Sequence, residues 1–169
     1  MDDALHGRWL ESVRKHRHDV LNLLQVAQGY LQLQRPEVAL SSLRQLSDWL
    51  NSLSALQSAI RSTETPVYQA ALTCPHVFVR RFACERVLTE AESDCVADLL
   101  EALDERAAEV GALEISVVLR TATEPDPSLY INVQCPQGFC TVAQDRISTE
   151  VSRMTEAGAR VYFSETNPV

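Results

Sequence analysis

The chain has 169 residues, of which 46% are hydrophobic and 22% charged, and its formal net charge is −8 at pH 7. This composition is typical of a globular protein of one or two domains, and the acidic charge argues against a nucleic-acid partner. No apolar run approaches the roughly 20 residues that span a bilayer, and the N-terminus lacks a signal-peptide pattern. We therefore expect a cytoplasmic protein that contacts neither nucleic acid nor membrane.

The first predicted element is a long amphipathic helix over residues 3–34. On a helical projection the polar residues gather around His18, and most apolar residues lie on the opposite side. His18 is therefore expected to face solvent midway along a polar stripe. His16, about 160° away around the helix, is expected to pack inside. The predicted buried side consists of Leu5, Trp9, Val13, Val20, Leu23, Leu24, Ala27 and Leu31.

A second helix is predicted from Pro36 to Arg61, because proline interrupts the first helix and is tolerated in the first turn of a new one. Its apolar positions step by four and three, which is typical of helices packed on other helices. These positions are Ala39, Leu43, Leu46, Leu50, Leu53, Gln57 and Ile60. In a lone antiparallel hairpin each helix meets only one neighbour. We therefore expect two chains to pair their hairpins into a four-helix bundle, as a homodimer.

Residues 62–66 have the composition of a linker, which divides the chain into domains at 1–62 and 63–169. The elements expected after the linker are a helix at 93–110, strands at 113–119 and 129–133, a helix at 143–157 and a strand at 160–163. Residues 67–72 suit a helix, and residues 76–82 suit either a strand or a helix. The two strands around the 121–128 loop should pair antiparallel. The second domain is thus predicted to be an α/β sandwich, and the whole chain an α+β protein.

The charge is unevenly distributed along the chain. Residues 1–62 carry 7 Lys/Arg against 6 Asp/Glu, whereas residues 63–169 carry 8 against 17. Basic side chains cluster around His18, and this local excess predicts an acidic partner surface. They are Arg8, Arg14, Lys15 and Arg17.

The cysteines show no pattern of a metal site or of a disulfide framework. Five are present and none form a CxxC pair. Cys135 and Cys140 flank a short loop, but a zinc site would need two more ligands. We expect free, mostly buried thiols at Cys74, Cys84, Cys95, Cys135 and Cys140, and no bound metal.

The residues from Arg17 to Gln34 carry a family resemblance. An Arg-His-Asp triplet is followed by an asparagine four residues after the histidine, and then by a Gly-Tyr-Leu-Gln-Leu segment. This block resembles the phospho-acceptor helix of the sporulation initiation phosphotransferase B family and of the related citrate/malate-type sensor histidine kinases. The matching residues are Arg17, His18, Asp19, Asn22, Leu24, Gln25, Gly29, Tyr30, Leu31 and Leu33. The resemblance implies a dimeric four-helix bundle followed by a domain of the histidine-kinase ATPase type.

The chemistry of the side chains supports a phospho-acceptor role for His18. An imidazole nitrogen is a competent nucleophile near neutral pH, and phosphoryl transfer mainly requires positioning and charge neutralisation. Asp19 can orient the ring or hold its proton. Arg14 and Asn22, one turn to either side, can donate hydrogen bonds to phosphoryl oxygens. The alternative is a histidine that is merely solvated on a polar face.

The resemblance also implies where ATP would bind, and the sequence departs from the family at those positions. Such kinases place an asparagine on the helix matching residues 96–110, and an aspartate and glycines after the strand matching 129–134. Here residues 96–110 contain no asparagine, and the continuation of that strand over residues 133–138 contains a single glycine, Gly138, and no acidic residue. The resemblance therefore implies a degenerate ATPase-like domain and no cofactor.

The function implied is that of a phosphorelay phosphotransferase. His18 would exchange a phosphoryl group with aspartates in the receiver domains of response regulators, in sporulation-type signalling, and the Mg²⁺ of the reaction would belong to the receiver. Two alternatives stay open. A sensor histidine kinase core would label His18 from ATP, and a non-catalytic adaptor would bind a regulator without any phosphorylation of His18.

Overall fold

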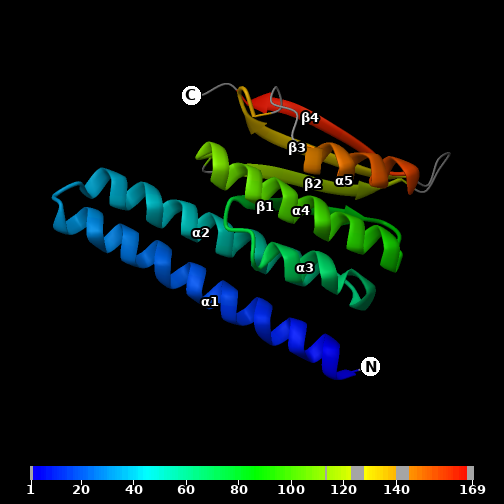
Figure 1. Ribbon diagram of the computed structural model, residues 1–169, viewed down its shortest axis with the longest axis horizontal. Coiled ribbons are helices and arrows are strands. Elements are labelled where there is room, and N and C mark those ends of the chain that lie inside the picture. Colours follow the sequence, from blue (N-terminus) through cyan, green and yellow to red (C-terminus); the bar gives the residue numbers. More distant parts are fainter. Residues whose placement is uncertain (1, 113, 123–127, 140–144, 167–169) are drawn as a thin grey trace.

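The computed structural model describes residues 2–112, 114–122, 128–139 and 145–166. It begins with two long antiparallel helices, α1 (Asp2–Gln32) and α2 (Pro36–Ala59), which confirms the predicted hairpin. The tip of this hairpin extends beyond the rest of the molecule (Figure 1). None of the helices in the described ranges is both long and apolar enough to cross a membrane.

The turn between the two helices depends on one unusual backbone conformation. Gln34 has a φ of 56°, in the left-handed region that residues with a side chain rarely adopt. The next amide, Arg35 N–H, donates to the Tyr30 carbonyl at 2.9 Å, which satisfies one of the free carbonyls at the end of α1. Helix α1 therefore ends two residues before the predicted Gln34 end.

The predicted linker at residues 62–66 is ordered structure: it forms a 3₁₀ turn, η1 (Ser62–Glu64), and the first turn of α3 (Thr65–Ala71), and Glu64 is buried. The stretch 76–82, for which the sequence allowed a strand or a helix, lies in and just before the strand β1 (Val77–Cys84). The next helix, α4 (Glu90–Val110), starts three residues earlier than predicted. Its start is set by a capping box, in which the Thr89 hydroxyl accepts from the Glu92 amide at 3.2 Å and the Glu92 carboxylate accepts from the Thr89 amide at 2.9 Å.

The strands form one mixed sheet in the order β1-β2-β3-β4. Its other members are β2 (Ile115–Thr121), β3 (Leu129–Pro136) and β4 (Arg160–Thr166), with α5 (Asp145–Glu156) between the last two. Strands β2 and β3 pair antiparallel, as predicted, while β1 and β4 run parallel to their neighbours. Helices α4 and α5 lie on the same face of the sheet (Figure 1). The α+β class is confirmed; the predicted strand start at 113 and helix start at 143 lie outside the described residues.

The core is continuous between the hairpin and the sheet. Trp49 and Leu56 of α2 are almost completely buried and belong to one cluster with Phe78 of β1 and Leu103 of α4. Helix α2 contacts β1 and α3 as well as α1. The premise that each hairpin helix meets only one neighbour is therefore wrong, because the second half of the chain covers part of the apolar surface of α2 and α3 also contacts α1. The domain boundary at residue 62 stays a prediction.

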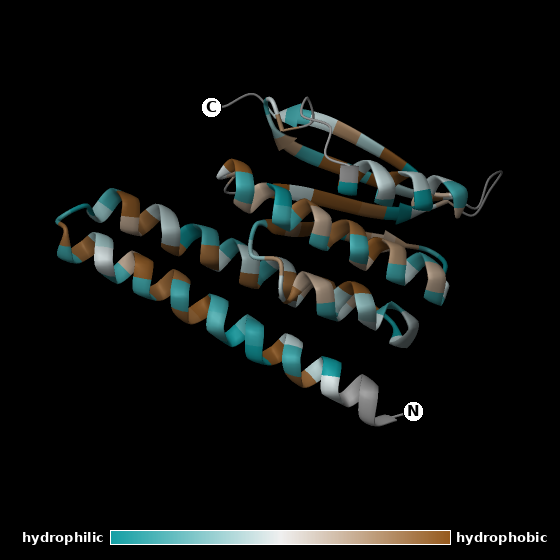
Figure 2. Cartoon of the chain, viewed as in Figure 1, coloured by the Kyte–Doolittle hydropathy of each residue, from teal (hydrophilic) through white to brown (hydrophobic). Residues whose placement is uncertain are grey.

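Part of the apolar surface of the hairpin nevertheless remains uncovered in the protomer. Figure 2 shows hydrophobic positions recurring along both helices. Of the residues predicted to be buried in α1, Ala27 is buried, whereas Trp9, Val13, Leu24 and Leu31 are exposed. The exposed large apolar residues of α1 after Trp9 are Leu10, Val13, Leu21, Leu24, Val26 and Leu31, and those of α2 are Leu40, Leu43 and Leu50. We call Leu10, Val13, Leu24, Leu31, Leu43 and Leu50 the apolar stripe.

Four of the five cysteines behave as predicted. Cys74, Cys84, Cys95 and Cys135 are free thiols, and each is buried or half-buried. Burial raises the pKa of Cys84 to about 12 and also raises that of Cys74. Such thiols carry little thiolate at neutral pH and are unreactive. Cys140 lies outside the described residues.

Candidate functional site

His18 lies in the middle of α1 with its side chain open to solvent. The side chain is 71% exposed, as the polar stripe predicts. The helix is continuous from Asp2 to Gln32, so the imidazole projects from a rigid backbone. A side chain that protrudes in this way is accessible to another macromolecule.

Two of the predicted partners lie against the His18 ring. Asp19 places Oδ1 at 3.4 Å from His18 Nδ1, and Asn22 places Nδ2 at 3.1 Å from the same nitrogen. Asn22 Nδ2 is also 3.5 Å from His18 Nε2. Nδ1 can form a hydrogen bond with only one of these neighbours at a time. It donates to Asp19 when it is protonated and accepts from Asn22 when it is not. Asp19 and Asn22 therefore favour opposite tautomers of the His18 ring.

The Asp19 carboxylate has unused capacity as an acceptor. Its side chain is only 18% exposed, and its second oxygen, Oδ2, is buried without a hydrogen-bond partner among the described residues. A buried carboxylate oxygen that lacks a donor is costly to the fold, so such groups are concentrated where function requires them. A positive charge that develops on the neighbouring imidazole would compensate this carboxylate.

The structure does not bring Arg14 to His18. The Arg14 guanidinium donates to Glu11 at 2.8 Å, and both side chains are about 70% exposed. Exposed pairs of this kind are weak, so the guanidinium can leave Glu11 when a phosphoryl group is present. The predicted role of Arg14 stays a prediction.

His16 faces the interior, as its position on the helix predicts. Its Nδ1 lies 3.0 Å from the Leu72 carbonyl, just after α3, and its ring lies 4.9 Å from the Trp49 ring. Trp49 Nε1–H donates to the Ala71 carbonyl at 3.2 Å. The backbone at the end of α3 is thus held by both hairpin helices. These contacts fix α1, two residues from His18, against the second half of the chain.

Sequence reasoning missed a groove that runs from α1 to α4. It encloses about 620 Å³ and is lined by Arg8 and Lys15 of α1 and by Asp98 and Glu101 of α4. Burial raises the pKa of Glu101. The two walls are more than 80 residues apart in the chain, so no local pattern could have predicted that they border one groove. The groove lies N-terminal to His18 along α1 and adds mixed charge to the surface around it.

The hairpin can be compared with known protein families. Residues 8–59 match the family model described as sensor kinase SpoOB-type, alpha-helical domain. Over these residues the hairpin is similar to the SpoOB-type alpha-helical domain. The match includes His18, Asp19 and Asn22 and ends where α2 ends. No curated protein and no solved structure matches the chain significantly.

The SpoOB-type domain relates the chain to two-component signalling and to the sporulation phosphorelay. This family is linked to phosphotransfer. The resemblance seen in the sequence of α1 is confirmed for the hairpin. Among the described residues, no group of three or more His, Cys, Asp and Glu side chains is arranged to hold a metal ion.

Proposed function

We propose that the chain is a phosphorelay histidine phosphotransferase that works through His18. The observation that supports this proposal most strongly is the exposed imidazole of His18 in a helix similar to the SpoOB-type domain. Asp19 and Asn22 both lie within hydrogen-bonding distance of its ring nitrogens. In the first step Nε2 attacks the phosphorus of an aspartyl phosphate in a receiver domain. The new N–P bond replaces the P–O bond, and the aspartate leaves as a carboxylate. The second step reverses this exchange towards the aspartate of another receiver.

The geometry supports Nε2 as the nucleophile. A neutral imidazole has one N–H, so Nε2 has a free electron pair only when Nδ1 is protonated. Asp19 Oδ1 is the acceptor that favours this tautomer. The ring becomes cationic once Nε2 is phosphorylated, and the Asp19 carboxylate stabilises that charge. With Nδ1 protonated, the Asn22 amide no longer donates to that nitrogen, and its Nδ2, 3.5 Å from Nε2, can donate to a phosphoryl oxygen instead.

Dimerisation through the hairpin is part of this proposal. The apolar stripe follows one side of α1 and α2 with spacings of three, seven and eleven residues, which return to the same side of a helix. A second hairpin would bury these side chains. Stabilisation of roughly 1.5–3 kcal/mol per large side chain would favour the dimer. The chain itself needs no cofactor in this scheme, because the Mg²⁺ of the reaction sits in the receiver.

The test is transfer from receiver domains. A panel of receivers phosphorylated with labelled acetyl phosphate is freed of the reagent and incubated with the protein, and the label is followed. We expect acid-labile, base-stable phosphate on the protein, its onward transfer to a second receiver, and no label on a His18→Gln variant of unchanged circular dichroism. Label on the His18→Gln protein overturns the proposal. Labelling from Mg-ATP alone would identify a kinase instead, and stable receiver complexes without any label an adaptor.

A further inference from the structure

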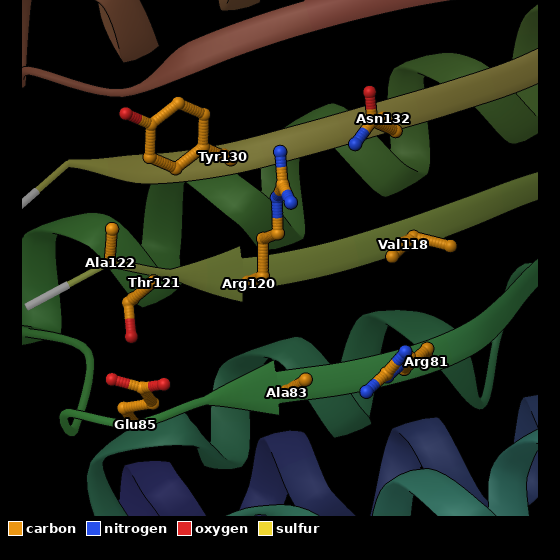
Figure 3. A pocket seen from close by; sticks show the side chains of 9 residues that line it. All are labelled: Arg81, Ala83, Glu85, Val118, Arg120, Thr121, Ala122, Tyr130 and Asn132. Carbon is orange, nitrogen blue, oxygen red and sulfur yellow. The ribbon is translucent and has the colours of Figure 1, made fainter.

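One face of the sheet is left open by the helices and carries a group of arginines. Figure 3 shows this face, with side chains from β1, β2 and β3 standing in front of the strands and the helices behind them. They include Arg81 of β1, Arg120 of β2, and Tyr130 and Asn132 of β3. They surround an open cavity of about 710 Å³. We call these four residues, together with Arg160 of β4, the arginine face.

Strand register fixes the arrangement of this face. Arg120, Tyr130 and Arg160 are direct cross-strand neighbours in one row. The guanidinium carbons of Arg120 and Arg160 lie 5.2 and 5.7 Å from the centre of the Tyr130 ring. The ring is therefore flanked by a cation from each neighbouring strand. A guanidinium stacked on a ring keeps its N–H groups directed outward, where they can bind a carboxylate in a two-pronged fashion.

Two arginines of this face, Arg81 and Arg120, lack an acidic partner among the described residues. Arg81 and Arg120 are exposed, and neither forms an ion pair within 4 Å with any carboxylate of the described ranges. Since Arg81 is paired with Val118, two residues before Arg120, the two arginines are diagonal neighbours, and like charges so placed repel each other. Glu85 is the acidic residue among the described residues that line the cavity. These arginines lie within residues 63–169, a segment with 17 acidic and 8 basic residues.

We infer that the arginine face is a docking surface for an acidic segment of a partner protein. Neighbouring strands lie about 4.8 Å apart, so Arg120 and Arg160, two strands apart, are separated by roughly 10 Å at the backbone, and Arg81 is one strand further. A single carboxylate or phosphate cannot contact all three. An extended segment with several Asp and Glu side chains, laid across the strands, can do so. The open form of the cavity suits a segment better than a small ligand, which a pocket would enclose.

The other anionic partners fit the surface less well. Single-stranded nucleic acid binds by stacking bases on exposed aromatic faces, and Tyr130 is already flanked by two guanidiniums. An anionic membrane is an extended surface and would meet the field of the whole chain, whose net charge is −8, whereas a peptide segment meets the arginine face alone. The docking surface is separate from the phospho-acceptor site, because α1 lies beyond α2 as seen from the sheet (Figure 1). Binding here therefore does not depend on the function proposed for His18.

The experiment measures binding of a fluorescent twelve-residue peptide of alternating Asp and Glu to the full chain at low salt. We expect saturable binding that weakens as salt rises, and none of the matched Asn/Gln peptide. The double variant Arg81→Gln/Arg120→Gln should bind about tenfold more weakly or worse. Asn132→Asp, which adds a carboxylate without touching an arginine, should also weaken binding. His18→Gln should bind like the wild type.

The matched control is the double variant Arg146→Gln/Arg153→Gln. It changes the net charge by the same amount, but on α5, which covers the other face of the sheet. Its affinity for the acidic peptide should stay within about twofold of the wild type. Equal losses in both double variants would show a non-specific charge effect and overturn the inference. The inference would also be overturned if the peptide did not bind at low salt. Tighter binding to dT12 or to phosphatidylserine vesicles than to the peptide would overturn it as well.

Discussion

Leu46 and Leu50 lie one turn apart on α2, yet one is buried within the protomer and the other is exposed. Leu46 is 6% exposed and belongs to the core shared with the sheet, whereas Leu50 is 37% exposed and belongs to the apolar stripe. The four-three pattern of α2 thus divides into two sides. One side faces the interior of the protomer and carries Ala39, Leu46 and Leu53. The other side faces solvent and carries Leu43 and Leu50. This division separates the stability of the fold from the proposed assembly.

The first prediction is that Leu50→Glu and Leu46→Glu have different effects. A glutamate at position 50 adds charge to the proposed dimer interface and leaves the protomer core intact, so we expect a folded monomer. At position 46 it buries an unpaired charge, which costs several kcal/mol, so we expect unfolding. Light scattering gives the mass, and circular dichroism gives the fold. A monomeric wild-type protein at micromolar concentration would contradict the dimer.

The second prediction concerns the two neighbours of the His18 ring. Asp19→Asn removes the charge that favours the Nδ1–H tautomer, and Asn22→Ala removes a donor beside Nε2. Each should slow transfer from a phosphorylated receiver by about tenfold, which corresponds to one charge-assisted hydrogen bond. Arg14→Ala should have a smaller effect, since that guanidinium is paired with Glu11. Single-turnover transfer rates measured by rapid quench rank the three variants. A larger loss of rate in Arg14→Ala than in Asp19→Asn or Asn22→Ala would refute this view of the site.

The third prediction separates His16 from His18. His16→Ala removes the contact with the Leu72 carbonyl and the packing on Trp49. The free energy of unfolding should fall by about 1–3 kcal/mol. His18→Ala should change it by less than about 0.5 kcal/mol, because that side chain is exposed. Urea denaturation followed by circular dichroism measures both. Equal destabilisation would show that His18 is also part of the core.

The sequence predicted the hairpin and the central strand pair because both have a clear local period. It could not decide residues 76–82, since Val77, Phe78 and Val79 are consecutive buried residues and a fully buried strand has no alternation. The Thr-x-x-Glu pattern of the Thr89–Glu92 capping box is present in the sequence. It lies before the first periodic residue of the predicted helix, so the apolar period alone places the start of α4 too late. The arginine face and the α1–α4 groove depend on crossover connections and on pairs distant in the chain. No local pattern contains that information.

The fourth prediction is an acid-dependent loss of stability through Glu92. The pKa of its carboxyl is lowered first by the hydrogen bonds from Arg86, whose Nη1 lies 2.8 Å away, while burial opposes the shift. A carboxyl with a lowered pKa stabilises the fold above its ordinary pKa of 4.5, and this contribution is lost as pH falls through the folded value. Glu92→Gln should therefore cost about 1.5–3 kcal/mol at pH 7 and progressively less below pH 4.5. Urea titrations from pH 3 to pH 7 test this, and a cost independent of pH would contradict it.

The fifth prediction uses two left-handed residues that follow helices. Gln34 after α1 has a φ of 56°, and Gly111 after α4 has a φ of 68°. Glycine adopts this region without a steric penalty, whereas a side chain costs about 1 kcal/mol. Gln34→Gly should therefore raise the free energy of unfolding by about 0.5–1 kcal/mol, even though it removes a side chain. Gly111→Ala should lower it by a similar amount, although no atom lies within 4 Å of the added Cβ. Gln32→Gly, inside the last turn of α1, is the control and should be destabilising by about 1 kcal/mol. If Gln34→Gly destabilised the protein as much as Gln32→Gly, then the turn would not be under backbone strain, and the boundary between α1 and α2 would be set by Pro36 alone.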